Sequence, residues 1–366
     1  MKVYLFACIE KNIGDDLFVK ILCERYPNVD FVITSRANYG SLKDIPNLIF
    51  SDLLEKWIRV SSLGQNNIIK ALAAKIIQLY YTYRLPQYEV GVFIVGNAFK
   101  NTKYTGWKQS RWIRERIRLV DRFYIISTNF GPFSEEQWKN DFDKIFSEMK
   151  DVCFRDNYSY ELFSQLPNVR FAPDAVFTLG MREHNKNKNV IISLIDCSFQ
   201  ARSEKLKKAA SIYEQKIADT INLLLTKGYR ITLLNSNKQQ DRPACDRILN
   251  KVNPTNISVL DYDGNLDKIF ELYENSSYVI GTRLHTIILG FLFKLTVVPI
   301  VYDIKVTNLL GECSFDQSFF DITKLKTVSE RDIVNALEKN GYLIPKIVLN
   351  KAQEQFIRLD KEFAKE

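Results

Sequence analysis

The sequence predicts an α/β protein built from two Rossmann-like domains that face a cleft. Short apolar runs rich in β-branched residues alternate with helical patterns in both halves of the chain. Strands that are apolar throughout are typical of parallel sheets covered by helices on both faces. The length of 366 residues exceeds what one ordinary hydrophobic core organises. We therefore expect an N-terminal domain over 1–180, a C-terminal domain over 190–325, and closing helices over 326–366.

The N-terminal half begins with the buried strand pattern "KVYLFAC" and the helix pattern "DDLFVKILCERY". Further strands are predicted at 30–35, 90–97, 122–128 and 151–156. The segment "MREHNKNKN" (181–189) is polar, charged and without periodicity, so we place the domain junction there. His184 within it is predicted to be a solvated linker residue.

The C-terminal half repeats the alternation more regularly. Its predicted strands lie at 189–196, 229–235, 256–262, 277–282 and 295–302. Its predicted helices lie at 204–227, 242–252 and 265–276, from Arg283, at about 328–340 and at 350–366. Gly228 is a helix C-terminal signal. Ligands of such sheets bind beyond the carboxyl ends of the strands, so the chemistry is expected in the loops that follow them.

Composition narrows the class of partner. A formal net charge of +8 and a pI near 9.0 favour an anionic partner. The first apolar run is too short for a signal peptide, and no run reaches the roughly 20 residues of a membrane span. Six cysteines without CxxC pairing indicate reduced thiols. We expect a cytoplasmic protein, with no cofactor and no metal cluster.

Three of the strand ends carry polar residues of ambiguous meaning. In "KNIGDDLF", Asn12 and the acids that follow fit helix capping, whereas Gly14 could let the backbone approach a ligand. Gly96–Asn97 fits a tight turn as well as a ligand contact. In "CFRDNYSYELF", Arg155 is either half of a surface pair with Asp156 or a fork for a carboxylate or phosphate.

The fourth strand end, "YVIGTRLHTIILGF", carries the strongest signal. We expect Thr282 as the N-cap, with Arg283, Leu284 and His285 in the first helical turn. Free amides and the helix dipole make such a turn an anion site, and Arg283 adds a planar cationic fork. The same dipole disfavours imidazolium, which would keep His285 neutral and able to accept a proton. A hydrogen-bonded structural histidine is the alternative, but the convergence of features favours function.

The next strand, "LTVVPIVYDIK", brings Tyr302, Asp303 and Lys305 to the same edge of the sheet. Lys305 is either a cation of the phosphate site or an ordinary solvated lysine, and the sequence leaves both open.

These elements together resemble the polysaccharide pyruvyl transferase family. The "GTRLHTIILGFLFKLTVVPIVYDIK" segment is similar to its R-x-H region, "KNIGDDLF" to its N-x-G-D element and "STNFGPF" to its G-P-F turn. "CFRDNYSYELF" is similar to its R-D-x-x-S element and "APDAVF" to its P-D-x-x-F element. The resemblance implies two facing Rossmann-like domains, as in GT-B glycosyltransferases. It also implies transfer of pyruvate from phosphoenolpyruvate onto a sugar as a cyclic ketal.

The resemblance also implies roles for individual residues. His285, Arg283 and Asp15 become the catalytic residues. The donor-binding residues become Asn12, Gly14, Arg155, Thr282, Leu284 and Lys305. His285 would be the base, and Asp15 or Asp16 the acid if burial raises its pKa. Two departures from the family pattern bear on the donor pocket: the usual glycine pair is Gly96–Asn97, and an arginine is missing from "VIISLIDCSF", with Arg202 further on.

A basic and aromatic region lies outside these motifs. Residues 56–84 carry five basic residues and no acid, and residues 100–122 carry eight basic residues interleaved with Tyr104, Trp107 and Trp112. One hypothesis is a peripheral face that docks on anionic lipid at the inner side of the cell membrane and meets a lipid-linked glycan. An amphipathic core helix plus a solvated basic helix explains the same residues, and the aromatics could also stack on sugars. No nucleic-acid motif accompanies them, so no nucleic-acid partner is expected.

Two other functions fit the same sequence. A GT-B glycosyltransferase using a nucleotide sugar could be built on the same two domains. A non-catalytic glycan- or lipid-binding component of an assembly pathway is favoured if the two departures are disabling.

Overall fold

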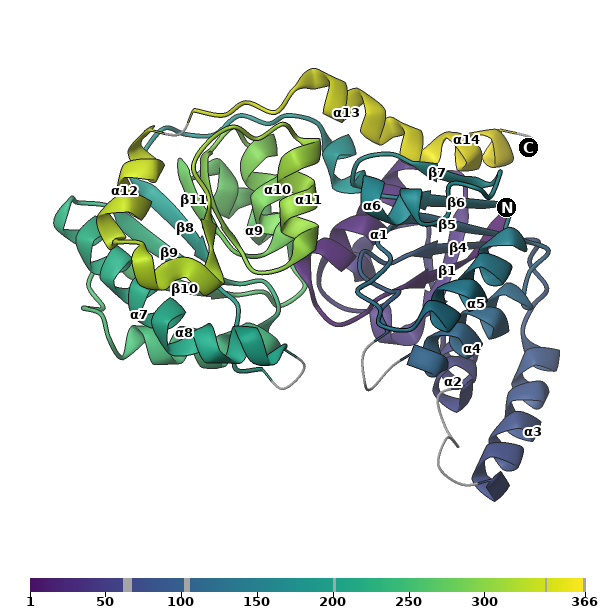
Figure 1. Ribbon diagram of the computed structural model, residues 1–366. Helices are drawn as coiled ribbons and strands as arrows, with labels where there is room; N and C mark the ends of the chain where they lie inside the picture. Colours follow the sequence, from purple (N-terminus) through teal and green to yellow (C-terminus); the bar gives the residue numbers. More distant parts are fainter. Residues whose placement is uncertain (62–67, 102–105, 200–201, 340, 365–366) are drawn as a thin grey trace. The chain divides into compact units, whose positions relative to one another are not determined.

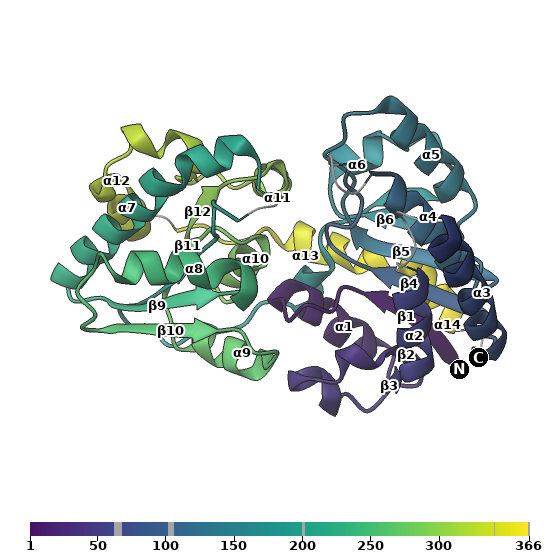
Figure 2. The same cartoon turned by 90° about the horizontal axis from the view of Figure 1, so that it is seen from below.

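The computed structural model describes residues 1–61, 68–101, 106–199, 202–339 and 341–364, and divides the chain into two compact units. The first unit contains residues 1–9, 15–175 and 351–366, and the second contains residues 10–14 and 176–350. A short loop from the N-terminal half therefore packs with the second unit, and the chain returns to the first unit at its end. Both termini lie close together on the first unit (Figures 1 and 2).

A seven-stranded parallel sheet in the order β3-β2-β1-β4-β5-β6-β7 forms the centre of the first unit. Its strands are β1 (Lys2–Ala7), β2 (Asp30–Thr34), β3 (Leu48–Ser51), β4 (Val90–Ile94), β5 (Arg122–Thr128), β6 (Asp151–Phe154) and β7 (Val169–Phe171). Every residue of β4 and β6 is buried, as expected for strands with helices on both faces.

Helices cover both faces of this sheet. The helices of the first unit are α1 (Ile13–Arg25), α2 (Asp52–Ser61), α3 (Ile68–Arg84), α4 (Gly106–Ile117), α5 (Glu136–Ser147), α6 (Asn157–Glu161) and α14 (Ile357–Phe363). The chain returns to the first unit within α13 (Lys346–Ala352). Tyr4 and Phe6 of β1 share a core cluster with Trp57 of α2 and Phe142 of α5. Figure 2 shows α2, α3 and α4 together on one side of the sheet. The C-terminal segment is tied to the sheet because the buried Gln355 side chain accepts a hydrogen bond from the amide of Ser127 at 2.9 Å.

A six-stranded parallel sheet in the order β10-β9-β8-β11-β12-β13 forms the centre of the second unit. Its strands are β8 (Asn189–Ser193), β9 (Arg230–Asn235), β10 (Ile257–Asp261), β11 (Tyr278–Gly281), β12 (Thr296–Val301) and β13 (Phe320–Asp321). Its helices are α7 (Glu204–Thr226), α8 (Lys238–Leu249), α9 (Leu266–Glu274), α10 (Leu284–Leu292), α11 (Ile304–Glu312) and α12 (Glu330–Lys339). Tyr213 and Ile217 of α7 pack with Leu337 of α12 against Ile192 of β8.

Each sheet has a topological switch point, where the chain leaves neighbouring strands in opposite directions. In the second sheet, β9 lies on one side of β8 and β11 lies on the other. The carboxyl ends of β8 and β11 therefore flank the position at which open α/β sheets bind ligands. In the first sheet, β1 and β4 hold the corresponding position.

The predicted fold class is confirmed: the architecture is two Rossmann-like domains with all-parallel sheets. Three short strands, β3, β7 and β13, were not predicted, because runs of two to four residues carry too little periodicity to stand out. Helix α8 begins at Lys238 rather than Arg242, because the Asn237 side chain caps it by accepting the amide of Gln240 at 3.2 Å.

The contacts divide the chain at other points than the sequence suggested. The N-terminal part of the first unit ends at Ala175 rather than at residue 180. Segment 181–189 belongs to the second unit, where the Arg182 amide donates a hydrogen bond to Leu292 O at 2.7 Å. His184 is half-buried rather than a solvated linker residue, with Nδ1 2.9 Å from Phe293 O. Residues 326–366 do not form one set of closing helices, since α12 belongs to the second unit and α14 to the first.

Part of the basic and aromatic region lies outside the described residues. Lys103 and Tyr104 lie outside the described residues, and so do the side chains of Lys70 and Trp107.

Within the described ranges, none of the helices combines the length and the apolar character that crossing a bilayer requires.

Candidate active site

The site is built around Arg283, which follows β11 at the switch point of the second sheet. Helix α10 begins at Leu284, so its N-cap is Arg283 and not Thr282 as predicted. The Thr282 side chain is fully buried, and its hydroxyl lies 3.2 Å from that of Tyr213. Thr282 therefore serves the core rather than the helix end.

The backbone at this turn is held by β8. The amides of Thr282 and Arg283 donate to Ser193 Oγ at 3.3 Å and 3.1 Å. Ser193 is the last residue of β8, so its hydroxyl ties the two strands of the switch point together. These two amides, which were expected to face a ligand, are used inside the protein.

The Arg283 guanidinium is oriented by a buried carboxylate. Its Nε donates to Asp241 Oδ2 at 3.1 Å, its Nη2 donates to Asp241 Oδ1, and Nη2 also lies 3.2 Å from Gln240 Oε1. Asp241 is fully buried, which raises its pKa, while the charge of Arg283 opposes that rise. A paired, buried carboxylate of this kind fixes the direction of the guanidinium. The sequence did not single out Asp241, because its partner is 42 residues away.

Cations surround Tyr302, which follows β12. The guanidinium carbon of Arg202 and the Nζ of Lys305 each lie 5.2 Å from the centre of its ring. Burial alone would raise the pKa of Tyr302, but the charges of Lys305, Arg283 and Arg202 outweigh burial and lower it to about 8. The lowered pKa of Tyr302 therefore indicates a strongly positive electrostatic potential at this edge of the second sheet.

Arg202 is the arginine nearest in sequence to the one missing from the family pattern. It lies just before α7 and beside Tyr302, so it adds a third cation to Arg283 and Lys305. Its Nε and Nη2 atoms are buried and have no hydrogen-bond partner among the described residues. Buried donors without acceptors are costly, so this cluster has both the charge and the donors to hold an anion.

His285 and Gly14 are in direct contact. His285, the second residue of α10, is partly exposed. A Cβ built on Gly14 would lie 1.7 Å from His285 Nδ1, so only glycine fits. Asn12 Oδ1 accepts the Gly14 amide at 3.3 Å and thus caps α1. The capping interpretation of this motif therefore holds for Asn12, and the structure gives Gly14 a further reason, the close approach of the imidazole.

The other predicted residues near His285 and Gly14 in the sequence differ in burial and in hydrogen bonding. Leu284 is buried in the core, and Lys305 is the second residue of α11, where its amide donates to Asp303 Oδ1 at 3.2 Å. Asp15 is half-buried in the first turn of α1. Asp16 is fully buried and accepts a hydrogen bond from the Tyr39 hydroxyl at 2.6 Å.

Arg155 lies in a separate polar network in the first unit. It is buried, its Nε donates to Asn129 Oδ1 at 2.6 Å, and its Nη1 donates to Asp174 Oδ2 at 2.7 Å. The predicted pair with Asp156 does not form on the surface, because Asp156 is buried and caps α6 by accepting the Ser159 amide at 2.9 Å. This network joins three motif elements at the ends of β5, β6 and β7 and gives Arg155 a structural role.

Gly96 is part of the same network. A Cβ at this position would lie 2.7 Å from Arg155 Nη1. The glycine at 96 therefore makes room for the guanidinium, and the second departure from the family pattern, at Asn97, does not alter this contact.

The predicted site residues therefore fall into two groups. Asn12, Gly14, Arg283, His285 and Lys305 belong to the second unit, together with Arg202, Asp241 and Tyr302. Asp15 and Arg155 belong to the first unit.

Two Rossmann-like domains, one of which gathers cations at the switch point of its sheet, define a GT-B-like protein. The chain belongs to the polysaccharide pyruvyl transferase family, which it matches over residues 12–304. The resemblance stated from its motifs is thus confirmed, and the chain is a transferase of polysaccharide biosynthesis.

Individual relatives are distant. The chain is 22% identical over 326 residues to the amylovoran biosynthesis protein AmsJ of Erwinia amylovora, covering 82% of this chain and 77% of that protein. The UDP-GlcNAc 2-epimerase of Methanocaldococcus jannaschii is similar in structure, with a TM-score of 0.55 and 11% identity over 99% of this chain and 100% of the other. A putative UDP-N-acetylglucosamine 2-epimerase from Listeria monocytogenes has a TM-score of 0.53 and 11% identity, covering 100% and 97%. At such identities the structural likeness shows the fold alone.

Replacing Gly14 with alanine should displace His285. The new methyl group overlaps the imidazole, and overpacking of this kind costs about 1–3 kcal/mol of stability. Urea unfolding measures the loss. Gly311→Ala is the matched control, because Gly311 lies in α11 with nothing within 4 Å of its Cβ position. Equal stability of the two variants would contradict the close contact.

Replacing Arg155 with alanine should destabilise the protein by about 3–5 kcal/mol, because Asp174 would be left buried without its counter-ion. Lys268→Ala breaks the exposed pair with Asp263 and should cost less than about 1 kcal/mol. A small effect at Arg155 in urea unfolding would show that its network is not structural.

Proposed function

We propose that this protein transfers pyruvate from phosphoenolpyruvate onto a sugar of a cell-surface polysaccharide, or of its lipid-linked precursor, as a cyclic ketal. The observation that carries the proposal is the cluster of Arg202, Arg283 and Lys305 around Tyr302. Phosphoenolpyruvate is a small molecule with a carboxylate and a phosphate, so its site requires several cations close together.

The arrangement suits this donor better than an apolar ligand. Arg202 supplies buried donors without protein acceptors, and Arg283 is held in one orientation by Asp241. Planar guanidinium groups match the geometry of carboxylate and phosphate oxygens. Lys305 contributes a point charge 5.2 Å from the centre of the phenol ring.

The chemistry requires one base and one acid. A proton is added to the methylene carbon of phosphoenolpyruvate, and a sugar hydroxyl adds to the adjacent carbon. A second hydroxyl then displaces phosphate from that carbon, which closes the ketal. Of the two hydroxyl protons, one replaces the proton that the acid gave to the methylene carbon, and the other leaves with phosphate. We assign His285 as the base and Asp15 or Asp16 as the acid.

The family supports the class of acceptor. A relative named for amylovoran biosynthesis supports a polysaccharide acceptor. We place the reaction in the cytoplasm, with a peripheral contact to anionic lipid at the inner face of the cell membrane, where a lipid-linked precursor would be presented. The donor is a substrate, and the proposal includes no cofactor or metal.

Incubation of the protein with phosphoenolpyruvate and candidate sugar acceptors should give a product with the added mass of the ketal. Phosphoenolpyruvate, but not a nucleotide sugar, should raise the melting temperature. Stabilisation by a nucleotide sugar instead would favour a glycosyltransferase. Stabilisation by neither would favour a glycan-binding component.

His285→Ala should lower kcat by about 100-fold or more, because the hydroxyls lose their base. His184→Ala is the matched control: it removes the only other histidine, whose Nδ1 contacts a backbone carbonyl of the second unit. Full activity of His285→Ala in the ketal assay would remove histidine from the mechanism.

Tyr302 provides a test that does not depend on turnover. Its neighbouring cations stabilise the phenolate, so the difference in ultraviolet absorbance between wild type and Tyr302→Phe should show one ionisation near pH 8. Lys305→Ala should move this ionisation to higher pH. Bound phosphoenolpyruvate should also raise the pKa of Tyr302, because its negative charge opposes the phenolate. Ionisation near pH 10 in the free protein, or no response to phosphoenolpyruvate, would contradict the placement of the donor.

A further inference from the structure

Helix α3 carries an apolar stripe on its outer side. Leu72, Ile76, Leu79, Tyr80 and Tyr83 are spaced i, i+4, i+7, i+8 and i+11, which places them on one face of a helix. Each is more than half exposed, and Tyr83 is 92% exposed. A helix on the surface of a water-soluble domain normally turns such a stripe toward the core.

The opposite face of α3 already has a partner, so the stripe is not a misplaced core face. Ala74 and Leu85 are buried, and the Thr82 hydroxyl accepts a hydrogen bond from Trp57 Nε1 of α2 at 2.8 Å. Helix α3 is therefore anchored on one side and apolar on the other. A contiguous exposed apolar surface of this kind marks an interaction site.

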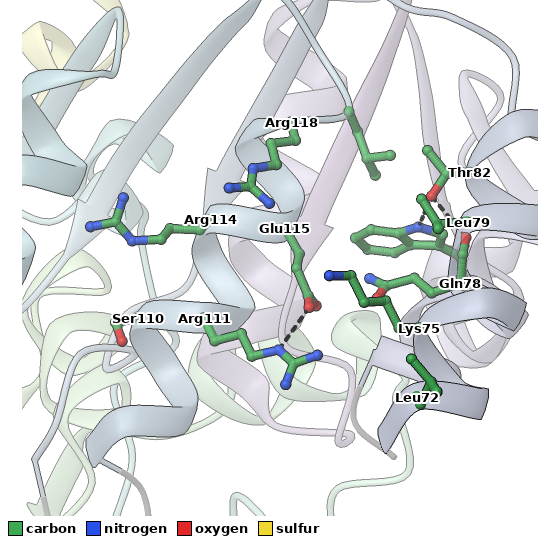
Figure 3. Close-up of a pocket in the computed structure, with 12 residues that line it drawn as sticks. Leu72, Lys75, Gln78, Leu79, Thr82, Ser110, Arg111, Arg114, Glu115 and Arg118 are labelled. Carbon is green, nitrogen blue, oxygen red and sulfur yellow. Dashed lines mark hydrogen bonds and ion pairs between the residues drawn. The ribbon is translucent and has the colours of Figure 1, made fainter. Parts of the chain in front are cut away.

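A cationic groove adjoins the stripe. It has a volume of about 660 Å³ and lies between α3 and α4, with Leu72, Lys75 and Leu79 on one wall (Figure 3). The other wall carries Arg111 and Arg114 of α4 and Arg118, which directly follows the helix, at the spacing i, i+3 and i+7.

The arginines of this wall can bind another anion. Arg111 pairs with Glu115 at 3.0 Å and Arg114 with Glu148 at 3.3 Å, and both arginines are at least a third exposed. The Arg114–Glu148 pair is exposed on both sides, so it contributes little and is readily replaced by another anion. Glu115 is largely buried and continues to hold Arg111, whose guanidinium still presents exposed donors. Arg118 has no ion pair among the described residues. Arg116 of the same helix points the other way, since it is buried and stacks on Trp112 at 3.6 Å.

An apolar stripe beside a row of arginines matches the interface of an anionic bilayer. Apolar and aromatic side chains enter the boundary between headgroups and acyl chains, and arginines bind the phosphates. A symmetric pair of this chain would instead place the two arginine rows near each other, at an electrostatic cost. Arg84 adds a cation at the end of the stripe itself, where it donates to the Tyr80 hydroxyl at 2.6 Å.

We propose that α3 and the arginine row of α4 form the membrane-docking surface of this protein. The stripe enters the interface of an anionic phospholipid bilayer, and the groove between the helices holds lipid phosphate. This inference deepens the proposed function, on which its biological purpose rests, by naming the surface that brings the transferase to a lipid-linked acceptor.

Flotation of the full-length protein with phosphatidylglycerol-containing vesicles tests the surface. Wild type should bind them, bind pure phosphatidylcholine vesicles at least about tenfold more weakly, and lose most binding at high salt. Ile76→Asp/Tyr83→Asp should weaken binding to the anionic vesicles by about tenfold or more, because two apolar side chains no longer enter the interface. Leu343→Asp is the matched control, since Leu343 is as exposed as Ile76 but belongs to the second unit, and it should bind like wild type.

The arginine row is tested separately. Arg111→Gln/Arg114→Gln/Arg118→Gln should reduce both the binding and its salt dependence, whereas Arg331→Gln on α12 should change neither. Circular dichroism and urea unfolding establish that each variant is folded. Undiminished vesicle binding by the folded stripe variant would overturn the proposal, as would a wild type that self-associates through the stripe and ignores vesicles.

Vesicle binding is read without phosphoenolpyruvate or a sugar acceptor. A protein that docks on vesicles but forms no ketal would retain the docking surface and refute the proposed reaction. A protein that forms the ketal on a soluble acceptor but ignores vesicles would retain the reaction and refute the docking surface.

Discussion

The buried contact between Arg283 and Asp241 is the interaction on which the candidate site depends. A guanidinium at a strand end is mobile unless its donors are bound, and Asp241 takes two of them. With Arg283 held in one orientation, its charge acts on the phenol of Tyr302 together with the charges of Arg202 and Lys305. Ser193 holds the backbone at this turn, so the strands that define the switch point also hold the cations.

Two glycines show how close packing shapes the motifs. Gly14 lies against His285 in the second unit, and Gly96 lies against Arg155 in the first. In both places a side chain would occupy the volume of a functional or structural group. Neither glycine has a positive φ, so close approach rather than backbone conformation explains the residue type.

Much of the fold was predictable because parallel strands with helices on both faces leave long apolar runs. β5 and α7 appear in the sequence almost at their observed bounds. Short strands such as β13 and the return of residues 351–366 to the first unit were not predictable, since they depend on contacts between distant segments. The Arg155 network illustrates the same limit: its partners Asn129 and Asp174 lie 26 and 19 residues away, whereas the adjacent Asp156 was the expected partner.

The sequence by itself determined the two-domain α/β class and the family, and it singled out Arg283 and His285 as candidates, because strand periodicity and helix-start motifs are local. Only the tertiary structure decided that Arg202 joins Arg283 and Lys305, that Asp241 orients the guanidinium, and that the stripe of α3 faces outward. The physical reason is that charge clustering and burial depend on which segments the sheet order brings together. A residue's neighbours along the chain do not specify that order.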